Sequence, residues 1–486
     1  MLTDRWIRGA FLSVIGFLAL TVAPTSAASS ADRAFCVDCL RVRVGPPIVV
    51  RGPFPDELDA TFSALKLEDG SFRGFSANGI TYAIDGPTLS KMDGARQAVL
   101  QKGAAGSLSE CGRWLTSVVR TEGEVLGLVH QERACDYSSG QTDKSMAIAV
   151  SRDDGLTWTN LGTVITGTDT PRQGTITGEG DCGMIDGRDG YLYAYCLRNS
   201  DWQTIVARAS ASDPTQWHKY YDGGWDQPGL GGEAAAIGFV GTGVGTLEPG
   251  WVAAIASDPW FGGLRLSLSQ DKVNFADLKD PLVSMDGAEW SRPAKSALLA
   301  YVSVLDPDSG GNAAGDRFLL SYVYVPPGKG FESRYLVQHE VTLSMEDEPV
   351  AVQVGMALTR WVDPEGKSFV TSTGPLTGDR LGYRRDVIVA YALTRAPDGA
   401  ASVRIAECSR DRQGQLDQIL AEDGRCEAEG YVSERTAGWL YTSEQPGTVP
   451  VYRCRYDAGQ SHFAASTADC DSLGVMDALL GYGLTQ

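Results

Sequence analysis

Four carboxylates in this chain precede short apolar runs in the same way, a pattern that could support acid–base chemistry. Asp59, Glu110, Asp181 and Glu233 are each followed by one or two small residues and then by a strand-like apolar stretch. Like charges raise one another's pKa, so a cluster of such acids can hold one carboxyl protonated while another stays ionised. Cleavage of a glycosidic bond requires that division between a proton donor and a base or nucleophile.

A fifth candidate acid, Glu179, lies in the stretch 178–199, which we interpret as one β-hairpin. Three tyrosines alternate along its second strand, so they should share one face. Cys182 and Cys196 flank the turn, where a cross-strand disulfide could form. Glu179 and Asp181 would share one face if the strand already runs there, and either of them could be the acid.

The acidic units repeat along the chain and indicate the elements that position them. Their spacing is about 50 to 70 residues, and a fifth unit without an acid starts near Ser296. That spacing suits a four-stranded propeller blade with its loops. We therefore expect an all-β chain with a five-bladed β-propeller over residues 46–350, after a short N-terminal segment, 28–45. The first strand of each blade opens on one channel, where the acids would converge.

A second motif falls on an expected outer hairpin. Residues 151–158, SRDDGLTW, match the Asp-box pattern S-x-D-x-G-x-[ST]-W of sialidases, and looser copies occupy 210–217 and 269–275. Asp153 can bind turn amides and Trp158 can pack between strands, so we interpret the motif as structural. With this motif and the blade pattern, residues 46–350 resemble the propeller glycoside hydrolases of the arabinanase and invertase groups.

The resemblance implies roles for the acids by blade position. Asp59 in the first blade would be the base or nucleophile, and Glu110 in the second would orient and tune it. Asp181 or Glu179 in the third would be the general acid, with Glu233 as an alternative. The chain departs from the family pattern because its second position is Glu, where Asp is usual.

Other side chains are candidates for substrate binding. Arg113 and His130 lie on the expected second-blade hairpin and could face the channel. Trp202 and Trp260 follow strand ends and could stack on a sugar ring. Each of the four could instead serve packing or structural hydrogen bonding.

Two other functions compete with a glycoside hydrolase that acts on a poly- or oligosaccharide. A sialidase-like enzyme would need several arginines that grip the substrate carboxylate, for which Arg73, Arg113 and Arg292 are candidates. A non-catalytic protein that binds cell-surface glycans would use the same fold without hydrolysis. Glycan binding that survives neutralisation of the four strand-start acids, without hydrolysis of any polysaccharide, would favour the non-catalytic protein.

From residue 351 to 486 the pattern changes to three copies of about 40 residues. Tyr391, Trp439 and Tyr482 occupy the same place in the three copies. We expect a β-trefoil-like domain, which resembles repeat modules appended to secreted bacterial hydrolases and would bind carbohydrate.

The ten cysteines fall into five close pairs, which predicts five local disulfides in an oxidising compartment. The short Cys36-x-x-Cys39 pair could otherwise belong to a zinc site, but no further ligands lie nearby. The pairs are Cys36 with Cys39, Cys111 with Cys135, Cys182 with Cys196, Cys408 with Cys426, and Cys454 with Cys470.

Residues 1–27 read as a cleaved signal peptide, so we expect a secreted or periplasmic protein. The formal net charge of −19 disfavours nucleic acid and anionic membranes as partners, and no later apolar run is long enough for membrane insertion. We expect a monomer with no cofactor and no metal site. Calcium is the one ion that acidic loops would permit, but no spacing specifies it.

Overall fold

The computed structural model describes residues 36–121, 123–248, 250–257, 263–287, 289–412, 415–456 and 461–486. Within these ranges the chain is built of β-strands, which confirms the predicted all-β class. The helical segments described are single 3-10 turns: η2 (Val37–Cys39), η4 (Phe331–Ser333), η5 (Gly378–Arg380), η6 (Glu427–Glu429) and η7 (Cys470–Ser472). The expected signal peptide lies outside the described residues.

Four groups of antiparallel strands follow one another from residue 63 to residue 284. The first group is β3 (Ser63–Lys66), β4 (Phe72–Asn78), β5 (Ile80–Gly86) and β6 (Gln97–Leu100). The second is β7 (Gly112–Thr121), β8 (Glu124–Asp136), β9 (Gln141–Ser151) and β10 (Thr159–Thr166). The third is β11 (Ile176–Asp186), β12 (Tyr191–Arg198), β13 (Gln203–Ser210), β14 (Asp213–Tyr221) and β15 (Gly224–Pro228). The fourth is β16 (Gly243–Leu247), β17 (Trp251–Ala256), β18 (Gly263–Ser269), β19 (Ala276–Asp277) and β20 (Val283–Ser284).

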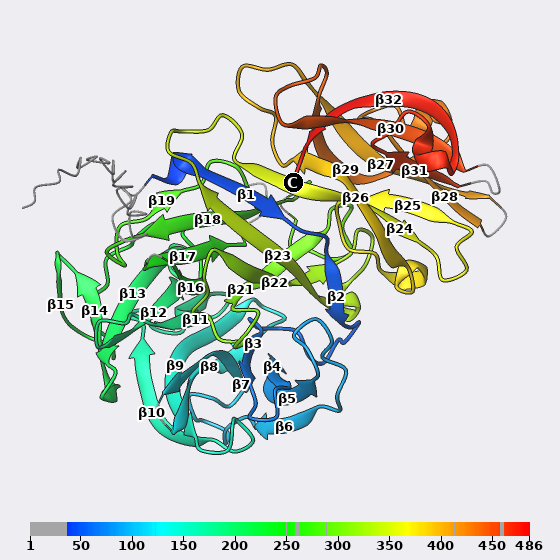
Figure 1. Ribbon diagram of the computed structural model, residues 1–486. Coiled ribbons are helices and arrows are strands. Elements are labelled where there is room, and N and C mark those ends of the chain that lie inside the picture. Colours follow the sequence, from blue (N-terminus) through cyan, green and yellow to red (C-terminus); the bar gives the residue numbers. More distant parts are fainter. Residues whose placement is uncertain are drawn as a thin grey trace, which may run out of the picture. The chain divides into compact units, whose positions relative to one another are not determined.

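A fifth group joins strands from the two ends of this region. Strands β21 (Leu298–Leu305), β22 (Arg317–Val325) and β23 (Tyr335–Met345) are completed by β1 (Leu40–Val44) and β2 (Ile48–Arg51), which pair antiparallel with β23. Figure 1 shows β1, in blue, beside β23. Residues 40–44, which the sequence placed in a separate N-terminal segment, are therefore part of this sheet.

The first strands of the five groups contact one another in cyclic order: β3 with β7, β7 with β11, β11 with β16, β16 with β21, and β21 with β3. Five apolar clusters fill the spaces between neighbouring groups; Phe75 and Leu115, for example, share the cluster between the first and second. None of the sheets closes on itself. Burial of side chains between sheets, together with a short parallel pairing of β11 with β9, therefore holds the groups together.

The three Asp-box-like stretches occupy equivalent turns, each between the third and fourth strands of a group. In the first, Asp153 accepts hydrogen bonds from the amide and hydroxyl of Thr157, and the Trp158 indole donates to the Gly155 carbonyl. In the second, the Trp217 indole donates to the Pro214 carbonyl. These bonds are local, as expected of a structural turn.

The C-terminal strands form three triplets, in each of which the first strand pairs with the other two. The third strands β26, β29 and β32 pair with one another, and Tyr391, Trp439 and Tyr482 all lie in those pairings. One apolar cluster draws side chains from all three triplets. The triplets are β24 (Val354–Val362), β25 (Phe369–Ser372) and β26 (Arg384–Leu393); β27 (Ser402–Arg412), β28 (Gln415–Glu422) and β29 (Val432–Tyr441); and β30 (Thr448–Tyr456), β31 (His462–Ala465) and β32 (Gly474–Leu484).

All five predicted disulfides are present, and every cysteine pairs as the sequence predicted. No helix in the described residues is long and apolar enough to cross a membrane. In the same part of the chain, no group of three or more His, Cys, Asp or Glu side chains is arranged to hold a metal ion.

Candidate active site

Asp59 lies just before β3 and faces partners from the fifth strand group. Its Oδ1 accepts from the Tyr301 hydroxyl at 3.2 Å and pairs with the Arg334 guanidinium at 2.9 Å. Its Oδ2 accepts no hydrogen bond from the described residues. The carboxyl is thus anchored through one oxygen and open at the other.

Asp181 lies at a β-bulge in β11. The pairing with β12 shifts between Gly180 and Gly183, and Asp181 has a φ of 52°, in the left-handed region. Its Oδ2 receives the Lys144 ammonium at 2.6 Å, while no hydrogen bond from the described residues reaches its Oδ1. Asp181 therefore has the same arrangement as Asp59, with one oxygen held and one open.

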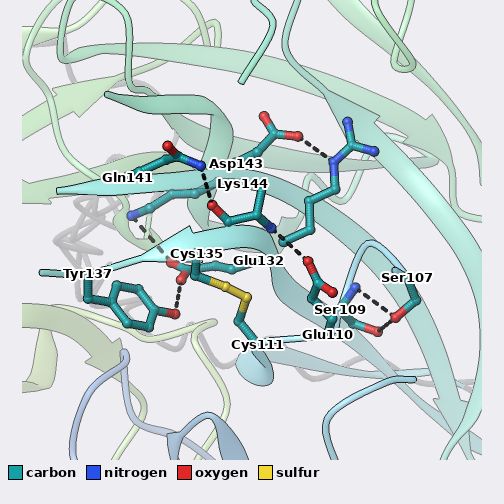
Figure 2. The surroundings of a disulfide bond; sticks show 12 residues. Ser107, Ser109, Glu110, Cys111, Glu132, Cys135, Tyr137, Gln141, Asp143 and Lys144 are labelled. Atoms are coloured by element: carbon teal, nitrogen blue, oxygen red, sulfur yellow. Dashed lines mark hydrogen bonds and ion pairs between the residues drawn. A yellow bond between two sulfur atoms is a disulfide. The ribbon is translucent and has the colours of Figure 1, made fainter. Parts of the chain in front are cut away.

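Three further side chains form a hydrogen-bonded chain that ends at Asp181. The Asp181 amide donates to His130 Nδ1 at 3.0 Å, and His130 Nε2 lies 3.0 Å from Glu132 Oε1. The Tyr137 hydroxyl donates to Glu132 Oε2 at 2.5 Å (Figure 2). His130 and Glu132 are buried, whereas Tyr137 is 63% exposed, so the end of the chain at Asp181 is shielded from water and the other end is not.

The pKa values of the two carboxyls are shifted in opposite directions. Burial raises the pKa of Asp59, more than Arg334 and the Tyr301 hydroxyl lower it, and the charges of Asp181 and Glu132 add to the rise. Burial would raise the pKa of Asp181 as well, but the nearby Lys144 ammonium outweighs it and lowers that pKa to about 2. Asp59 is therefore the better proton donor, and Asp181 stays ionised.

A pocket of about 480 Å³ opens beside Asp181. Lys144, Asp181 and Tyr301 contribute to its polar side. Trp202 and Trp290 line it with indole rings that are 47% and 40% exposed. Exposed aromatic side chains in the same pocket as the Asp181 carboxylate suit a sugar ring, which presents axial C–H groups and hydroxyls on different sides.

Glu179 does not share the surroundings of Asp181, although it is two residues away. Its carboxylate is buried and pairs with Lys219 of β14 at 2.8 Å, and burial raises its pKa more than Lys219 lowers it. The bulge explains the separation, because it breaks the alternation that would place both acids on one face.

Glu110 accepts hydrogen bonds from backbone amides close to its own hairpin. Its two oxygens accept from the amides of Gly106 and Ala134, and these bonds lower its pKa. Figure 2 shows it beside the Cys111–Cys135 disulfide. This carboxylate is occupied with loop amides and makes no contact with Asp59 or Asp181 among the hydrogen bonds of the described residues.

Glu233 is exposed in the loop between β15 and β16. The sequence predicted a strand directly after it, but β16 begins only at Gly243. Alanine-rich residues 234–237 follow the acid without entering the sheet, so Glu233 does not start an inner strand. Arg113 contacts Ser109 at 3.2 Å, away from the acids that the site brings together.

Of the sequence candidates, Asp181 and His130 are bonded to each other and Trp202 lines the pocket beside Asp181, while Asp59 is linked to that pocket through Tyr301, which bonds Asp59 and lines the pocket. Trp260 lies outside the described residues. The arginines considered for a substrate carboxylate bind separate partners: Arg73 pairs with Asp85, Arg113 contacts Ser109, and Arg292 donates to the Ser296 carbonyl.

Sequence reasoning missed five polar residues of the site, which are Glu132, Tyr137, Lys144, Tyr301 and Arg334. Glu132 and Lys144 face each other in the β8–β9 ladder, and Tyr301 lies at a bulge in β21 with a φ of 54°. One indication of Glu132 and Tyr137 was present in the sequence, because they lie on either side of Cys135 in the disulfide-linked hairpin. Arg334 had no such signal, since it follows a loop far along the chain.

Comparisons with known proteins show resemblance at the level of solved structures alone. No family model matches this chain, and no curated protein matches it by sequence. Among solved structures, an α-L-arabinofuranosidase from Lactobacillus brevis is 14% identical, with 59% of this chain and 91% of that chain covered and a TM-score of 0.40. A GH32 β-fructofuranosidase from Bombyx mori is 9% identical, with 88% and 89% covered and a TM-score of 0.41. A family 117 glycoside hydrolase from Zobellia galactanivorans is 10% identical, with 64% and 94% covered and a TM-score of 0.41.

Proposed function

We propose that this protein is a glycoside hydrolase whose site lies between Asp59 and Asp181. The observation that carries the proposal is the pair of carboxyls with opposite pKa shifts, each held through one oxygen and open at the other. Hydrolysis of a glycosidic bond needs one protonated and one ionised carboxyl at the same site. The neighbouring pocket with its exposed indole rings supports a carbohydrate substrate.

The roles follow from the charges. Asp59 donates a proton through its open Oδ2 to the oxygen of the leaving group. Asp181 remains ionised and uses its open Oδ1 either to attack the anomeric carbon or to take a proton from the attacking water. This assignment reverses the one that blade position implied, in which Asp59 was the base or nucleophile and Asp181 the acid. The chemistry of two carboxyls at a glycosidic bond needs no redox cofactor.

The architecture that we propose for this site is a five-bladed β-propeller over residues 46–350, with a β-trefoil-like carbohydrate-binding domain over residues 351–486. The cyclic contacts of the five first strands support the propeller. The mutual pairing of β26, β29 and β32 supports the threefold domain. Five disulfides support a secreted or periplasmic location, where the compartment is oxidising.

The test is the release of reducing ends from a panel of poly- and oligosaccharides by the purified protein and three variants. Asp59→Asn and Asp181→Asn should each abolish release from the substrate that the wild type accepts. Glu233→Gln is the control and should keep full activity, because that side chain is exposed and outside the site. Activity that persists in Asp181→Asn would refute the proposal. Glycan binding without hydrolysis of any substrate would favour a non-catalytic binding protein instead.

A further inference from the structure

The bulge at Asp181 leaves a backbone amide without a partner in the sheet, and a side chain accepts its hydrogen bond instead. Between Gly180 and Gly183 the ladder with β12 is interrupted, so the Asp181 amide has no carbonyl partner in β12. A buried amide without a partner destabilises a fold. His130 Nδ1, from β8 in the neighbouring strand group, accepts this amide at 3.0 Å.

The other side of the imidazole is fixed as well. Because Nδ1 accepts a hydrogen bond from the Asp181 amide, a neutral His130 carries its proton on Nε2, which donates to Glu132. Glu132 is held in turn by the Tyr137 hydroxyl. The chain of bonds thus selects one tautomer of His130.

Packing leaves the imidazole one position. Its ring lies edge-on to Trp114, with centroids 5.3 Å apart. Gly180 also lies close to the ring, since an added Cβ there would come within 2.6 Å of His130 Cε1. A glycine at 180 therefore permits the close approach that the bond from the Asp181 amide requires.

We propose that His130 is a positioning residue of the active site: it accepts the Asp181 amide and so holds that residue in the left-handed conformation that directs its carboxylate at Lys144 and the pocket. The proposal rests on the proposed function. His130 makes no hydrogen bond to a reacting atom in this scheme: its Nδ1 lies 3.9 Å from Asp181 Oδ1, and its two ring nitrogens are bonded to the Asp181 amide and to Glu132. Displacement of a catalytic group by about 1 Å can lower a rate by about 100-fold, which is the scale expected if this support is lost.

The first test needs no substrate. The ¹⁵N NMR shifts of the histidine rings in the wild-type protein report which nitrogen carries the proton. For His130 we expect a protonated Nε2 and an unprotonated, hydrogen-bonded Nδ1 at neutral pH. A protonated Nδ1 would overturn the proposal, because that nitrogen could not then accept the Asp181 amide.

The second test uses two substitutions that separate the acceptor from the rest of the ring. His130→Asn keeps an oxygen near the position of Nδ1, whereas His130→Leu keeps bulk but has no acceptor. On the substrate that the panel identifies, His130→Leu should lose about 100-fold in kcat with KM within about 3-fold. His130→Asn should stay within about 10-fold of the wild-type kcat. Equal loss in both variants, or full activity in His130→Leu, would contradict the proposal.

A matched control is available in His339, which is also buried and bonded through both nitrogens, to Tyr322 and to the Gly45 carbonyl. His339→Leu should lower the melting temperature but leave kcat per folded molecule unchanged. If His130→Leu does not fold, His130→Asn decides: activity supports the proposal, and a folded variant as inactive as Asp181→Asn overturns it.

The two proposals fail in different ways. Activity in Asp181→Asn would refute the glycoside hydrolase mechanism, while the NMR shifts would still show whether His130 accepts the Asp181 amide. An inactive Asp181→Asn together with a fully active His130→Leu would leave the mechanism standing and remove His130 from it.

Discussion

Replacement of Lys144 by Met should destabilise the protein in a pH-dependent way. Lys144 Nζ lies 2.6 Å from Asp181 Oδ2. Burial acts to raise the pKa of Asp181, and the ammonium outweighs it to bring the pKa from 3.8 to about 2. Met has similar length and no charge, so Lys144→Met removes the ammonium and leaves the Asp181 carboxylate without a counterion.

The magnitude follows from the pKa. One pKa unit corresponds to about 1.4 kcal/mol, so the ionised Asp181 contributes roughly 2 kcal/mol to folding in the wild type. Because its folded pKa is lowered, this contribution is present above the unfolded pKa near 4 and is lost as the pH falls through about 2. A buried charge left alone costs more than the pair contributed, so we expect a loss of about 3 kcal/mol at pH 7.

The assay is urea unfolding of the wild type and Lys144→Met at several pH values between 2 and 8. The difference in free energy of unfolding should be largest at neutral pH. It should shrink as the pH falls, beginning near or above pH 4, because Asp181 takes up its proton earlier in the variant. A difference below about 0.5 kcal/mol at pH 7, or one that does not change with pH, would refute this account of the site.

Lys279 provides a matched control. It pairs with Asp398, whose pKa is also lowered to about 2, by Arg395 and by Lys279. Both side chains of this pair are more than half exposed, so water screens the interaction. Lys279→Met should therefore have a much smaller effect than Lys144→Met at every pH tested.

Three further predictions concern the same site. Gly180→Ala places a Cβ 2.6 Å from His130 Cε1 and should lower both the melting temperature and kcat; an unchanged kcat would contradict the packing described here. Replacing Cys111 and Cys135 by Ser opens a loop with a sequence separation of 24, which should cost about 3 kcal/mol in urea unfolding, and unchanged stability would count against a structural role for this bond. Trp202→Ala removes an indole ring from the pocket wall and should raise KM with little change in kcat; a fall in kcat alone would place the indole in transition-state binding instead.

Much of the fold was readable from local patterns. The disulfide pairs were predictable because each joins cysteines close in sequence. The hairpin around Cys182 and Cys196 was predictable for the same reason. The threefold C-terminal pattern was visible because Tyr391, Trp439 and Tyr482 recur at similar intervals, of 48 and 43 residues. Local repeats of this kind depend on neighbours in the chain, which the sequence contains.

The parts that sequence reasoning missed depend on long-range pairing or on irregular backbone. Strand β1 completes the sheet of β23, about 300 residues away, and no local signal indicates that pairing. The prediction of a strand directly after Glu233 was wrong, because the apolar, alanine-rich residues that follow it lie in a loop. The bulge at Asp181 was equally invisible, and it decides which of two neighbouring acids reaches the pocket.

The sequence indicated candidate acids for the site, but it did not indicate which of them would be protonated and which ionised. Asp59 and Asp181 were identified from expected positions before strands, although Asp181 lies within β11, and Glu110 has the same signal but binds loop amides. The charge states depend on Lys144 and Arg334, which approach from other strands. Roles assigned from blade position alone could not include those neighbours, and the pKa shifts favour the opposite assignment that we propose.

The most direct test of this account compares leaving groups in the two acid variants. On aryl glycosides of the sugar that the panel identifies, a dinitrophenyl leaving group needs no proton donor, whereas a phenyl leaving group does. Asp59→Asn should recover activity on the dinitrophenyl substrate and stay inactive on the phenyl one, while Asp181→Asn should be inactive on both. Recovery in Asp181→Asn but not in Asp59→Asn would contradict the account, because it would make Asp181 the proton donor.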